Sequence, residues 1–255
     1  MTDAELSARL RANLRELKAL QARSGALRML ELPGVRAFAL PGRAADSLFQ
    51  QQVVYAEARA LAEALVSLEA WYRELGVHAW YVPVSPGDAA VEAVLARAGH
   101  RPEGSIPAMG LALAHPPPQL PPGPTLEHPE EVDGVLRLNG LCSGRENVDH
   151  FEAWCPPPLP SAHLYAVLVR EGGRALACGV SFEQGDTAGI YCVATHPEAR
   201  RRGLAGLVMQ GLHADARARG CTVAVLQASA LGYGLYQRLG YRDLGAWTNW
   251  VRRTG

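Results

Sequence analysis

Residues 191–206 read YCVATHPEARRRGLAG, and they form the most specific pattern in the sequence. An apolar segment with strand character runs into a loop rich in Arg and Gly, and the loop opens a helix with apolar residues at helical spacing. A helix N-terminus exposes unpaired N–H groups and the positive end of the helix dipole. Glycine and alanine let an anion approach the backbone closely, so the stretch predicts a strand–loop–helix unit that binds a phosphate or pyrophosphate.

Outward from this junction, the C-terminal half alternates strands and helices. Glycine-containing turns separate three strand-like runs and so predict a hairpin meander. The helix that follows the loop has a buried stripe of Leu204, Leu207, Val208 and Leu212, and Gly220 ends it. The complete expectation here is a helix near residues 129–139, strands at 162–170, 174–183 and 187–195, a helix at 203–219, a strand at 222–228, a short helix ending near 239 and a last strand around 244–251.

The N-terminal half has the same mixed character. The expected elements are a helix at residues 3–22, strands at 26–31 and 35–40, a long helix ending at Gly76, a strand at 79–84 and a helix at 88–98. Between the halves, residues 115–124 read HPPPQLPPGP, which is typical of an extended linker. We therefore predict an α/β (α+β) protein with a domain at 1–115, a proline-rich linker at 116–124 and a second domain at 125–255.

A weak internal repeat connects the two halves. Gly76 and Ser85 enclose an apolar segment, and Gly220 and Ser229 enclose another with the same separation. Further on, the sequence AGHR at residues 98–101 corresponds to LGYR at 239–242. The repeat favours a tandem duplication, although chance similarity between two α/β segments stays open.

Composition excludes several classes of function. The formal net charge is +0, so no global charge favours nucleic acid or an anionic membrane. The 5 cysteines are irregularly spaced without a CxxC pair, which argues against a disulfide framework or a zinc site. The first residues are polar, and no apolar run is long enough to span a bilayer. We expect a cytoplasmic protein without a metal, a nucleic-acid partner or a membrane partner, as a monomer or homodimer.

The segment Arg200-x-x-Gly203-x-Ala205 resembles the Arg/Gln-x-x-Gly-x-Gly/Ala signature of the GNAT superfamily of N-acetyltransferases. Residues 226–241 resemble the next block of that family, a strand and a short helix ending in Tyr-x-x-x-Gly-Phe/Tyr. The resemblance implies two modules, each with a mixed, partly parallel β-sheet flanked by helices. The N-terminal module lacks the signature, which implies a degenerate module with a structural or substrate-binding role.

The family resemblance also implies a site. The co-substrate would be acetyl-CoA, and its pyrophosphate would be held by Arg200, Arg201, Arg202, Gly203, Ala205 and Gly206. Val193 and Thr195 would lie along the pantetheine arm, with the Val193 amide near the thioester oxygen. Ser229 stands where many members have a CoA-contacting Asn. Arg201 replaces a Gly found in many members, and a positive φ would be less comfortable there.

The implied reaction is direct transfer of an acetyl group to a primary amine of a small molecule or peptide. Tyr236 occupies the position of the family's general acid. For the general base Glu183 is the first candidate, with Tyr191 and His163 as alternatives, because the strand before the loop has no carboxylate. The loop 142–160 is where such enzymes often recognise their acceptor.

Other interpretations stay open at this stage. The arginine run could be a solvated turn, Tyr236 a core residue and Ser229 a helix N-cap. Cys192 is more typical of a small buried side chain than of a nucleophile. A non-catalytic regulatory or interaction protein that binds acyl-CoA is the alternative function.

Overall fold

A computed structural model describes residues 1–23, 25, 27–40, 50–113, 125–128, 133–142 and 163–254. The chain forms two compact units, and neither is continuous in sequence. Unit 1 consists of Met1–Leu17 and Ala108–Leu244, and unit 2 of Lys18–Pro107 and Gly245–Gly255. No helix within the described ranges is long and apolar enough to cross a membrane.

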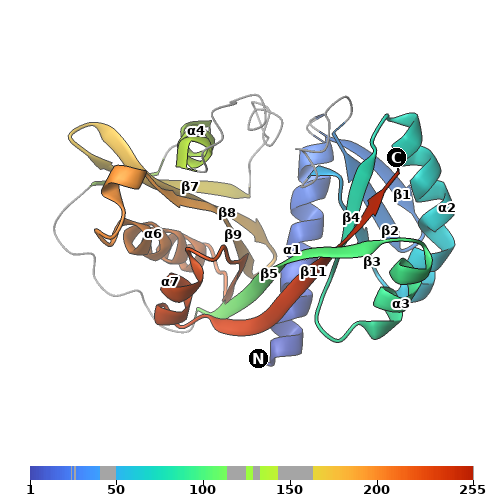
Figure 1. Ribbon diagram of the computed structural model, residues 1–255. Helices are drawn as coiled ribbons and strands as arrows, with labels where there is room; N and C mark the ends of the chain where they lie inside the picture. The colour runs from blue at the N-terminus through green and yellow to red at the C-terminus, as the bar shows by residue number, and fades with distance from the viewer. Residues whose placement is uncertain are drawn as a thin grey trace. The chain divides into compact units, whose positions relative to one another are not determined.

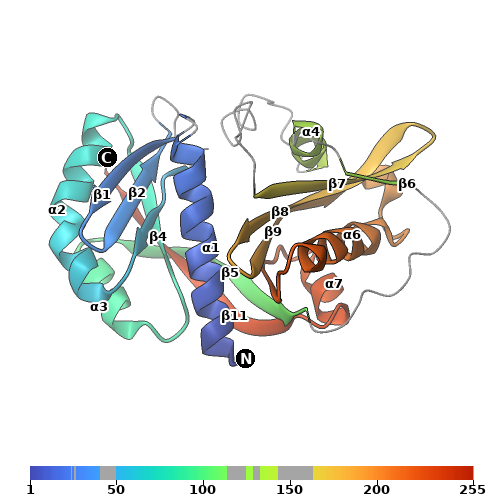
Figure 2. The ribbon, with the colours of Figure 1, turned by 180° about the vertical axis from the view of Figure 1, so that it is seen from behind.

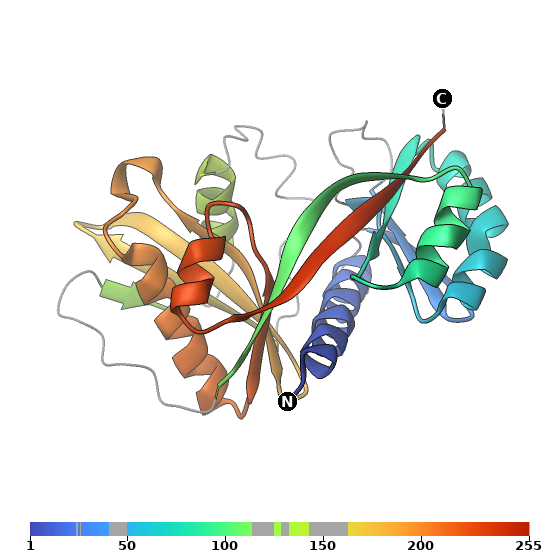
Figure 3. The same ribbon diagram turned by 60° about the horizontal axis from the view of Figure 1, so that its bottom comes forward.

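Most elements belong to one unit (Figures 1 and 2). Unit 1 contains most of α1 (Asp3–Arg23), then β6 (Thr125–Glu127), α4 (Asp133–Cys142), β7 (Leu164–Glu171), β8 (Arg174–Gln184), β9 (Thr187–Thr195), the 3₁₀ turn η2 (Pro197–Ala199), α6 (Leu204–Ala218), β10 (Val223–Gln227) and α7 (Tyr233–Arg238). Unit 2 contains β1 (Arg28–Leu32), β2 (Val35–Ala39), β3 (Val53–Tyr55), α2 (Ala58–Glu74), β4 (Ala79–Val84) and α3 (Ala89–Arg97). Two long strands, β5 (Arg101–Ala112) and β11 (Arg242–Arg253), have residues in both units (Figure 3).

The main sheet is mixed. Its eight strands follow the order β4-β11-β5-β10-β9-β8-β7-β6. Strands β6 to β9 pair antiparallel in succession, β9 and β10 pair parallel, and β10 pairs antiparallel with β5. The predicted α/β fold with a mixed, partly parallel sheet and flanking helices is therefore confirmed.

Helices cover both faces of the unit 1 sheet. Helix α4 lies over one face of β7, β8 and β9, and α6 lies over the other (Figures 1 and 2). The stripe predicted for α6 is present, since Leu204, Val208 and Leu212 are buried and Leu207 packs against the same cluster. Burying such a stripe against a sheet is the main stabilisation of a helix that would be marginal alone.

Unit 2 has its own core. Strands β1, β2 and β3 form a three-stranded antiparallel sheet, while α2 packs against β2, β3 and α3. Helix α2 buries Leu61, Leu68 and Tyr72. The Tyr72 ring stacks on Trp80 of β4 with centroids 5.0 Å apart.

An exchange of strands explains why the units are discontinuous. Residues 108–112 of β5 come from the N-terminal half but pair with β10 in unit 1. Residues 248–253 of β11 come from the C-terminal half but pair with β4 in unit 2. These units differ from the predicted division at residues 116–124, a linker that lies outside the described residues.

The two copies of the sequence repeat adopt the same local structure. Gly76 and Gly220 both have positive φ, 68° and 91°, and each follows a helix and precedes a strand. Gly99 and Gly240, in the AGHR and LGYR segments, also have positive φ, 81° and 88°. Glycine meets the left-handed requirement of a helix C-terminus without a steric penalty.

Candidate acyl-CoA site

The chain turns sharply between β9 and α6. Strand β9 ends at Thr195, η2 follows, and Gly203 is the N-cap of α6 with φ 80°. Arg201 also has positive φ, 61°. A left-handed conformation costs a non-glycine residue about 1–2 kcal/mol. The positive φ considered for Arg201 from the sequence is therefore present, and the backbone is strained there.

The start of α6 is open to a ligand. The backbone N–H of Leu207 donates to the carbonyl of Gly203, so the amides of residues 204–206 precede the first hydrogen bond of the helix. A Cβ added to Gly203 or Gly206 would meet no atom of the described residues within 4 Å. Unpaired amides, open space and the positive helix end fit one phosphate of a pyrophosphate.

The arginine side chains at this turn point in different directions. Arg200 donates from Nε to the Thr195 carbonyl at 3.4 Å and from NH2 to the Cys142 carbonyl at 3.3 Å. Arg202 binds both carboxylate oxygens of Glu171, at 2.7 and 2.9 Å. The guanidinium groups of Arg200 and Arg202 are therefore engaged by other groups of the protein.

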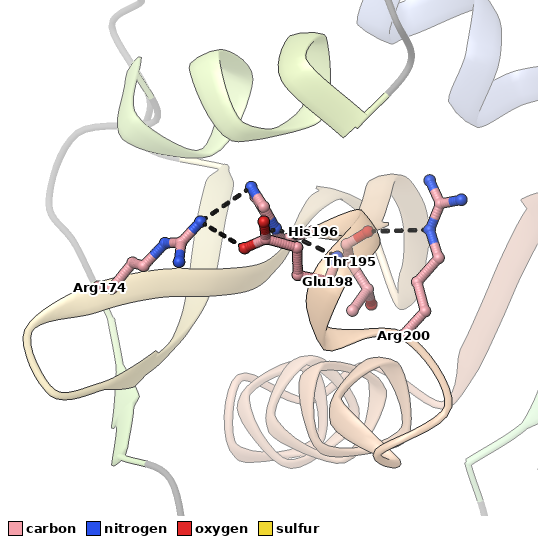
Figure 4. A network of polar contacts seen from close by, with 5 residues as sticks. All are labelled: Arg174, Thr195, His196, Glu198 and Arg200. Carbon is pink, nitrogen blue, oxygen red and sulfur yellow. Dashed lines mark hydrogen bonds and ion pairs between the residues drawn. The ribbon is translucent and has the colours of Figure 1, made fainter.

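A polar network borders the turn (Figure 4). The Arg174 guanidinium lies 3.0 Å from Oε2 of Glu198 and 3.3 Å from Nε2 of His196. The His196 backbone N–H donates to the Leu176 carbonyl at 2.8 Å, which joins the end of β9 to β8. These contacts fix the path of the chain from Thr195 to Arg200.

Strand β9 contains a β-bulge before the turn. Cys178 is opposite Ala194 and Val180 is opposite Tyr191, so two residues of β9 face Gly179 alone. One of the two, Cys192, has φ 54°. A bulge of this kind interrupts the ladder and redirects local backbone groups.

Gly179 makes room for the bulge. A Cβ there would lie 2.7 Å from Val208 and 3.3 Å from Val193. The parallel pairing of β9 with β10 ends at Ile190 and Leu226, whereas β9 continues to Thr195. The backbone of residues 191–195 therefore extends past the ladder on this side, next to the bulge.

Tyr236 comes from the next block of sequence, on α7. Its side chain is buried in the same cluster against which Val193 packs. A Cβ on Gly232 would lie 2.8 Å from the Tyr236 ring, so glycine at 232 is needed for the observed position of the tyrosine. Burial raises the pKa of Tyr236 to about 12, which keeps the phenol protonated at neutral pH.

Ser229 forms hydrogen bonds within the turn that leads into α7. Its Oγ accepts a hydrogen bond from the Gly232 N–H at 3.2 Å, and its carbonyl accepts from the Tyr233 N–H at 3.0 Å. The residue is exposed and closes the turn into α7. The N-cap of α7 is Gly232, and the Ser229 hydroxyl stabilises the turn that precedes the helix.

The candidate bases lie in different settings. The carboxylate of Glu183 is buried and paired with Arg219 at 2.7 Å. It faces Ala188 in the ladder, five residues and roughly 16 Å along β9 from Val193. Burial raises the pKa of Tyr191, whose hydroxyl donates to Asn13, and His163 is exposed where β7 begins.

Sequence reasoning missed Asn13 and Gly189. Asn13 lies on α1 and is fully buried beside β9. A Cβ at Gly189 would lie 1.9 Å from the Asn13 Oδ1 atom. The available signal was a polar residue between Leu10 and Leu14 in the apolar stripe of the first helix.

Residues 130–243 match the family described as an acetyltransferase (GNAT) domain. This part of the chain is a GNAT domain. It includes the turn between β9 and α6 and the short helix that carries Tyr236. Members of this family use acetyl-CoA as co-substrate. Among the described residues, no group of three or more His, Cys, Asp or Glu side chains is placed to hold a metal ion.

Solved structures share the fold over most of the chain. A GCN5-related N-acetyltransferase from Kribbella flavida has a TM-score of 0.69 and 19% identity, with 96% of each chain covered. A GCN5-related N-acetyltransferase from Sphaerobacter thermophilus has a TM-score of 0.62 and 18% identity, covering 87% of this chain and 78% of that one. A tandem GNAT protein from the clavulanic acid biosynthesis pathway has a TM-score of 0.64 and 16% identity, with coverage of 87% and 78%. The sequence matched none of the curated proteins with which it was compared.

Proposed function

We propose that the protein transfers an acetyl group from acetyl-CoA to a primary amine in a ternary complex. The observation that carries the proposal is the open start of α6 directly after the bulged end of β9. The amides of residues 204–206 are proposed to bind the pyrophosphate. Residues 191–195 then lie along the pantetheine arm, because they continue the same strand into the turn.

The acyl carbonyl is proposed to lie against the backbone of the bulge. A neutral amine attacks the carbonyl carbon, a C–N bond forms, and negative charge develops on the oxygen. A backbone N–H at Val193 or its neighbour would stabilise this charge, as fixed donors do in oxyanion holes. Placing amine and thioester side by side removes much of the entropic barrier.

Tyr236 is the proposed general acid. When the C–S bond breaks, the thiolate takes the phenolic proton, and the proton released by the new amide nitrogen restores the phenol through solvent. The buried setting of Tyr236 supports this role, since its phenol stays protonated at the pH where an amine can be neutral.

Amine deprotonation is not assigned to Glu183 in this proposal. Its carboxylate is committed to Arg219, and its place in the ladder is far from Val193. Tyr191 and His163 are also omitted. The acceptor is proposed to reach the site as a free amine, which predicts a rate that rises with pH up to the amine pKa.

The N-terminal half is proposed to be a degenerate copy of the same module. The shared Gly-to-Ser segment and the paired positive-φ glycines support a duplication. Its long helix follows β3 without the Arg-x-x-Gly-x-Gly/Ala sequence, so a single acetyl-CoA site in the chain is expected. The acceptor would be a small-molecule or peptide amine.

The test is calorimetric titration with acetyl-CoA, followed by release of free thiol with a panel of amines. One-site binding and thiol release above the buffer rate with at least one amine class would support the proposal. Absence of binding by acetyl-CoA and longer acyl-CoAs would overturn it.

The alternative is a regulatory protein that binds acyl-CoA without turnover. The lack of a free carboxylate on β9 and the pairing of Glu183 with Arg219 favour it. It predicts tight binding of acetyl-CoA with no thiol release across the whole amine panel. The same two measurements therefore separate the two functions.

A further inference from the structure

One buried polar residue of α1 reaches the strand that carries the bulge. The Tyr191 hydroxyl donates to Oδ1 of Asn13 at 2.5 Å, and Nδ2 of Asn13 donates to the Phe182 carbonyl at 3.0 Å. Phe182 of β8 is the ladder partner of Gly189 on β9. Asn13 therefore contacts both strands of the β8–β9 pair, on the N-terminal side of the bulge.

The neighbouring glycine shows how closely Asn13 approaches the sheet. A Cβ at Gly189 would lie 1.9 Å from Oδ1 and 2.7 Å from Cγ of Asn13. The amide of Asn13 thus occupies the space where the next side chain on this face would stand. Such an approach is a reason for glycine inside a strand, where it otherwise weakens the sheet.

Asparagine at this position is costly unless it has a specific role. The same face of α1 buries Leu6, Leu10, Leu14 and Leu17, and Asn13 has 0% exposure. Asn is a poor residue for a helix interior, and a buried amide needs its hydrogen bonds. Leucine would serve packing alone, so the two bonds of Asn13 indicate a positioning role.

The residue after Tyr191 is the strained one. Cys192 has φ 54°, a conformation that a non-glycine residue keeps only when its surroundings fix it. Ile190 and Val193 both pack in the cluster under α6, although they are an odd number of residues apart. The bulge therefore shifts the alternation of side chains between the two faces of β9. It lies between Tyr191, which Asn13 holds, and Val193, which packs in the cluster under α6.

We propose that Asn13 is a positioning residue for the acyl-transfer site. It holds Tyr191 so that the bulge at Cys192 and Val193 keeps its backbone amides directed out of the ladder. The inference rests on the proposed function, because it assigns those amides to the thioester oxygen. The N-terminal helix, outside the matched GNAT domain, thereby contributes to catalysis without contacting the substrate.

The test is a double-mutant cycle of Asn13→Ala and Tyr191→Phe. We expect each single variant to lower kcat about 10-fold and leave the Kd for CoA within about 2-fold, since the pyrophosphate turn is untouched. The double variant should be no worse than about 10-fold, because both changes remove one interaction. Wild-type kcat in a folded Asn13→Ala variant, or an additive fall of about 100-fold, would overturn the inference.

The matched control is Leu10→Ala, which removes a buried side chain one turn away on the same helix. It should lower the urea midpoint while leaving kcat within about 2-fold. Equal losses of kcat in Leu10→Ala and Asn13→Ala would show general destabilisation and would count against positioning.

Amide hydrogen exchange gives a readout that does not need activity. Asn13→Ala should raise exchange at Cys192 and Val193 at least 10-fold relative to Leu10→Ala, because the anchor beside these amides is lost. If the wild type binds no acetyl-CoA but this difference is seen, the proposed function fails while the anchor stands. If the wild type is active and neither kcat nor exchange responds, the inference alone fails.

Discussion

Helix α6 of unit 1 and helix α2 of unit 2 begin in different surroundings. In unit 1 a turn of eight residues, 196–203, separates β9 from α6, and added atoms at Gly203 and Gly206 meet open space. In unit 2 only Ala56 and Glu57 separate β3 from α2. The turn between β1 and β2 lies against the chain that enters α2, because the Ala56 N–H donates to the Gly34 carbonyl at 2.8 Å.

Gly34 of this turn also packs closely against α2. A Cβ there would lie 2.9 Å from Ala60 in the first turn of α2. Glu57, the N-cap, adds an acidic side chain without a capping hydrogen bond. From this comparison we expect an anion at the start of α6 and not at the start of α2, because a helix dipole needs accessible unpaired amides beside it to hold an anion.

The largest expected effect is on binding at the open helix start. Gly206→Glu places an acid in the first turn of α6 without requiring positive φ, and we expect the Kd for acetyl-CoA to rise more than about 100-fold. Gly203→Glu should abolish binding as well. Arg59→Glu, which places an acid in the first turn of α2, should leave the Kd within about 2-fold. Calorimetry on all three variants measures the Kd for acetyl-CoA. An equal loss of affinity in the α6 variants and in Arg59→Glu would contradict the difference between the two helix starts.

The next effect concerns Tyr236 and Leu95, which stand at the same position when the AGHR and LGYR segments are aligned. Leu95 is fully buried and has no group that can donate a proton. Tyr236→Phe should lower kcat about 100-fold at an unchanged Kd for acetyl-CoA, because only the proton donor is lost. Tyr233→Phe, on the same helix α7, should leave kcat within about 2-fold. Thiol-release assays measure kcat for both variants. Equal kcat values for Tyr236→Phe and the wild type would contradict the role of Tyr236 as general acid.

A pH effect should appear in both units. Burial lowers the pKa of His213 in unit 1 and of His100 in unit 2, each to about 4. The unfolded residues bind protons near pH 6.5, so each neutral histidine contributes stability above that pH, and the contribution is lost as pH falls from about 6.5 to about 4. At pH 5 the loss is about 2 kcal/mol per histidine.

Urea unfolding at pH 7 and pH 5 measures this loss. His100→Leu and His213→Gln should each reduce the difference between the two pH values by about 2 kcal/mol. Both histidines are nearly inaccessible to solvent, at 1% and 5% exposure, so little screening is expected. A variant with the wild-type pH dependence would show that its histidine is accessible before unfolding.

The smallest effect is at the strained arginine. Arg201→Gly removes the left-handed penalty but increases the entropy of the unfolded chain, so we expect a gain in unfolding free energy of at most about 1 kcal/mol. Arg202→Gly should lower it by about 1 kcal/mol, because it loses the ion pair with Glu171. Acetyl-CoA binding should survive Arg201→Gly if amides hold the pyrophosphate. A lower free energy of unfolding for Arg201→Gly than for the wild type would contradict backbone strain at Arg201.

Local patterns predicted the elements around the site closely. The strand at 187–195 and the helix after Gly203 agree with the structure within a residue, because periodicity and glycine positions act locally. Strand β5 was not predicted, since residues 101–107 contain two prolines and a glycine that usually interrupt strands. Its last residues form a strand because β10 pairs with them.

The sequence predicts Gly203, Ala205 and Gly206 as site residues from their small size and their position before an apolar helix. The structure places them at the start of α6. The sequence did not predict that Arg200 would reach the Cys142 carbonyl or that Glu183 would pair with Arg219, because those partners are distant in sequence. The loop predicted at 142–160 lies outside the described residues except for Cys142, which ends α4.

The exchange of strands between the halves has a consequence for synthesis on the ribosome. Residues 18–107 of unit 2 emerge early, but β4 lacks its pairing partner until residues 248–253 have been translated. At about 5–20 residues per second, that delay is roughly 10–30 s. During this interval the exposed edge of β4, with Trp80, Tyr81 and Val82 at its centre, is a template for intermolecular pairing. Nascent chains of this protein should therefore depend on early chaperone contact at a strand that lies outside the matched GNAT domain.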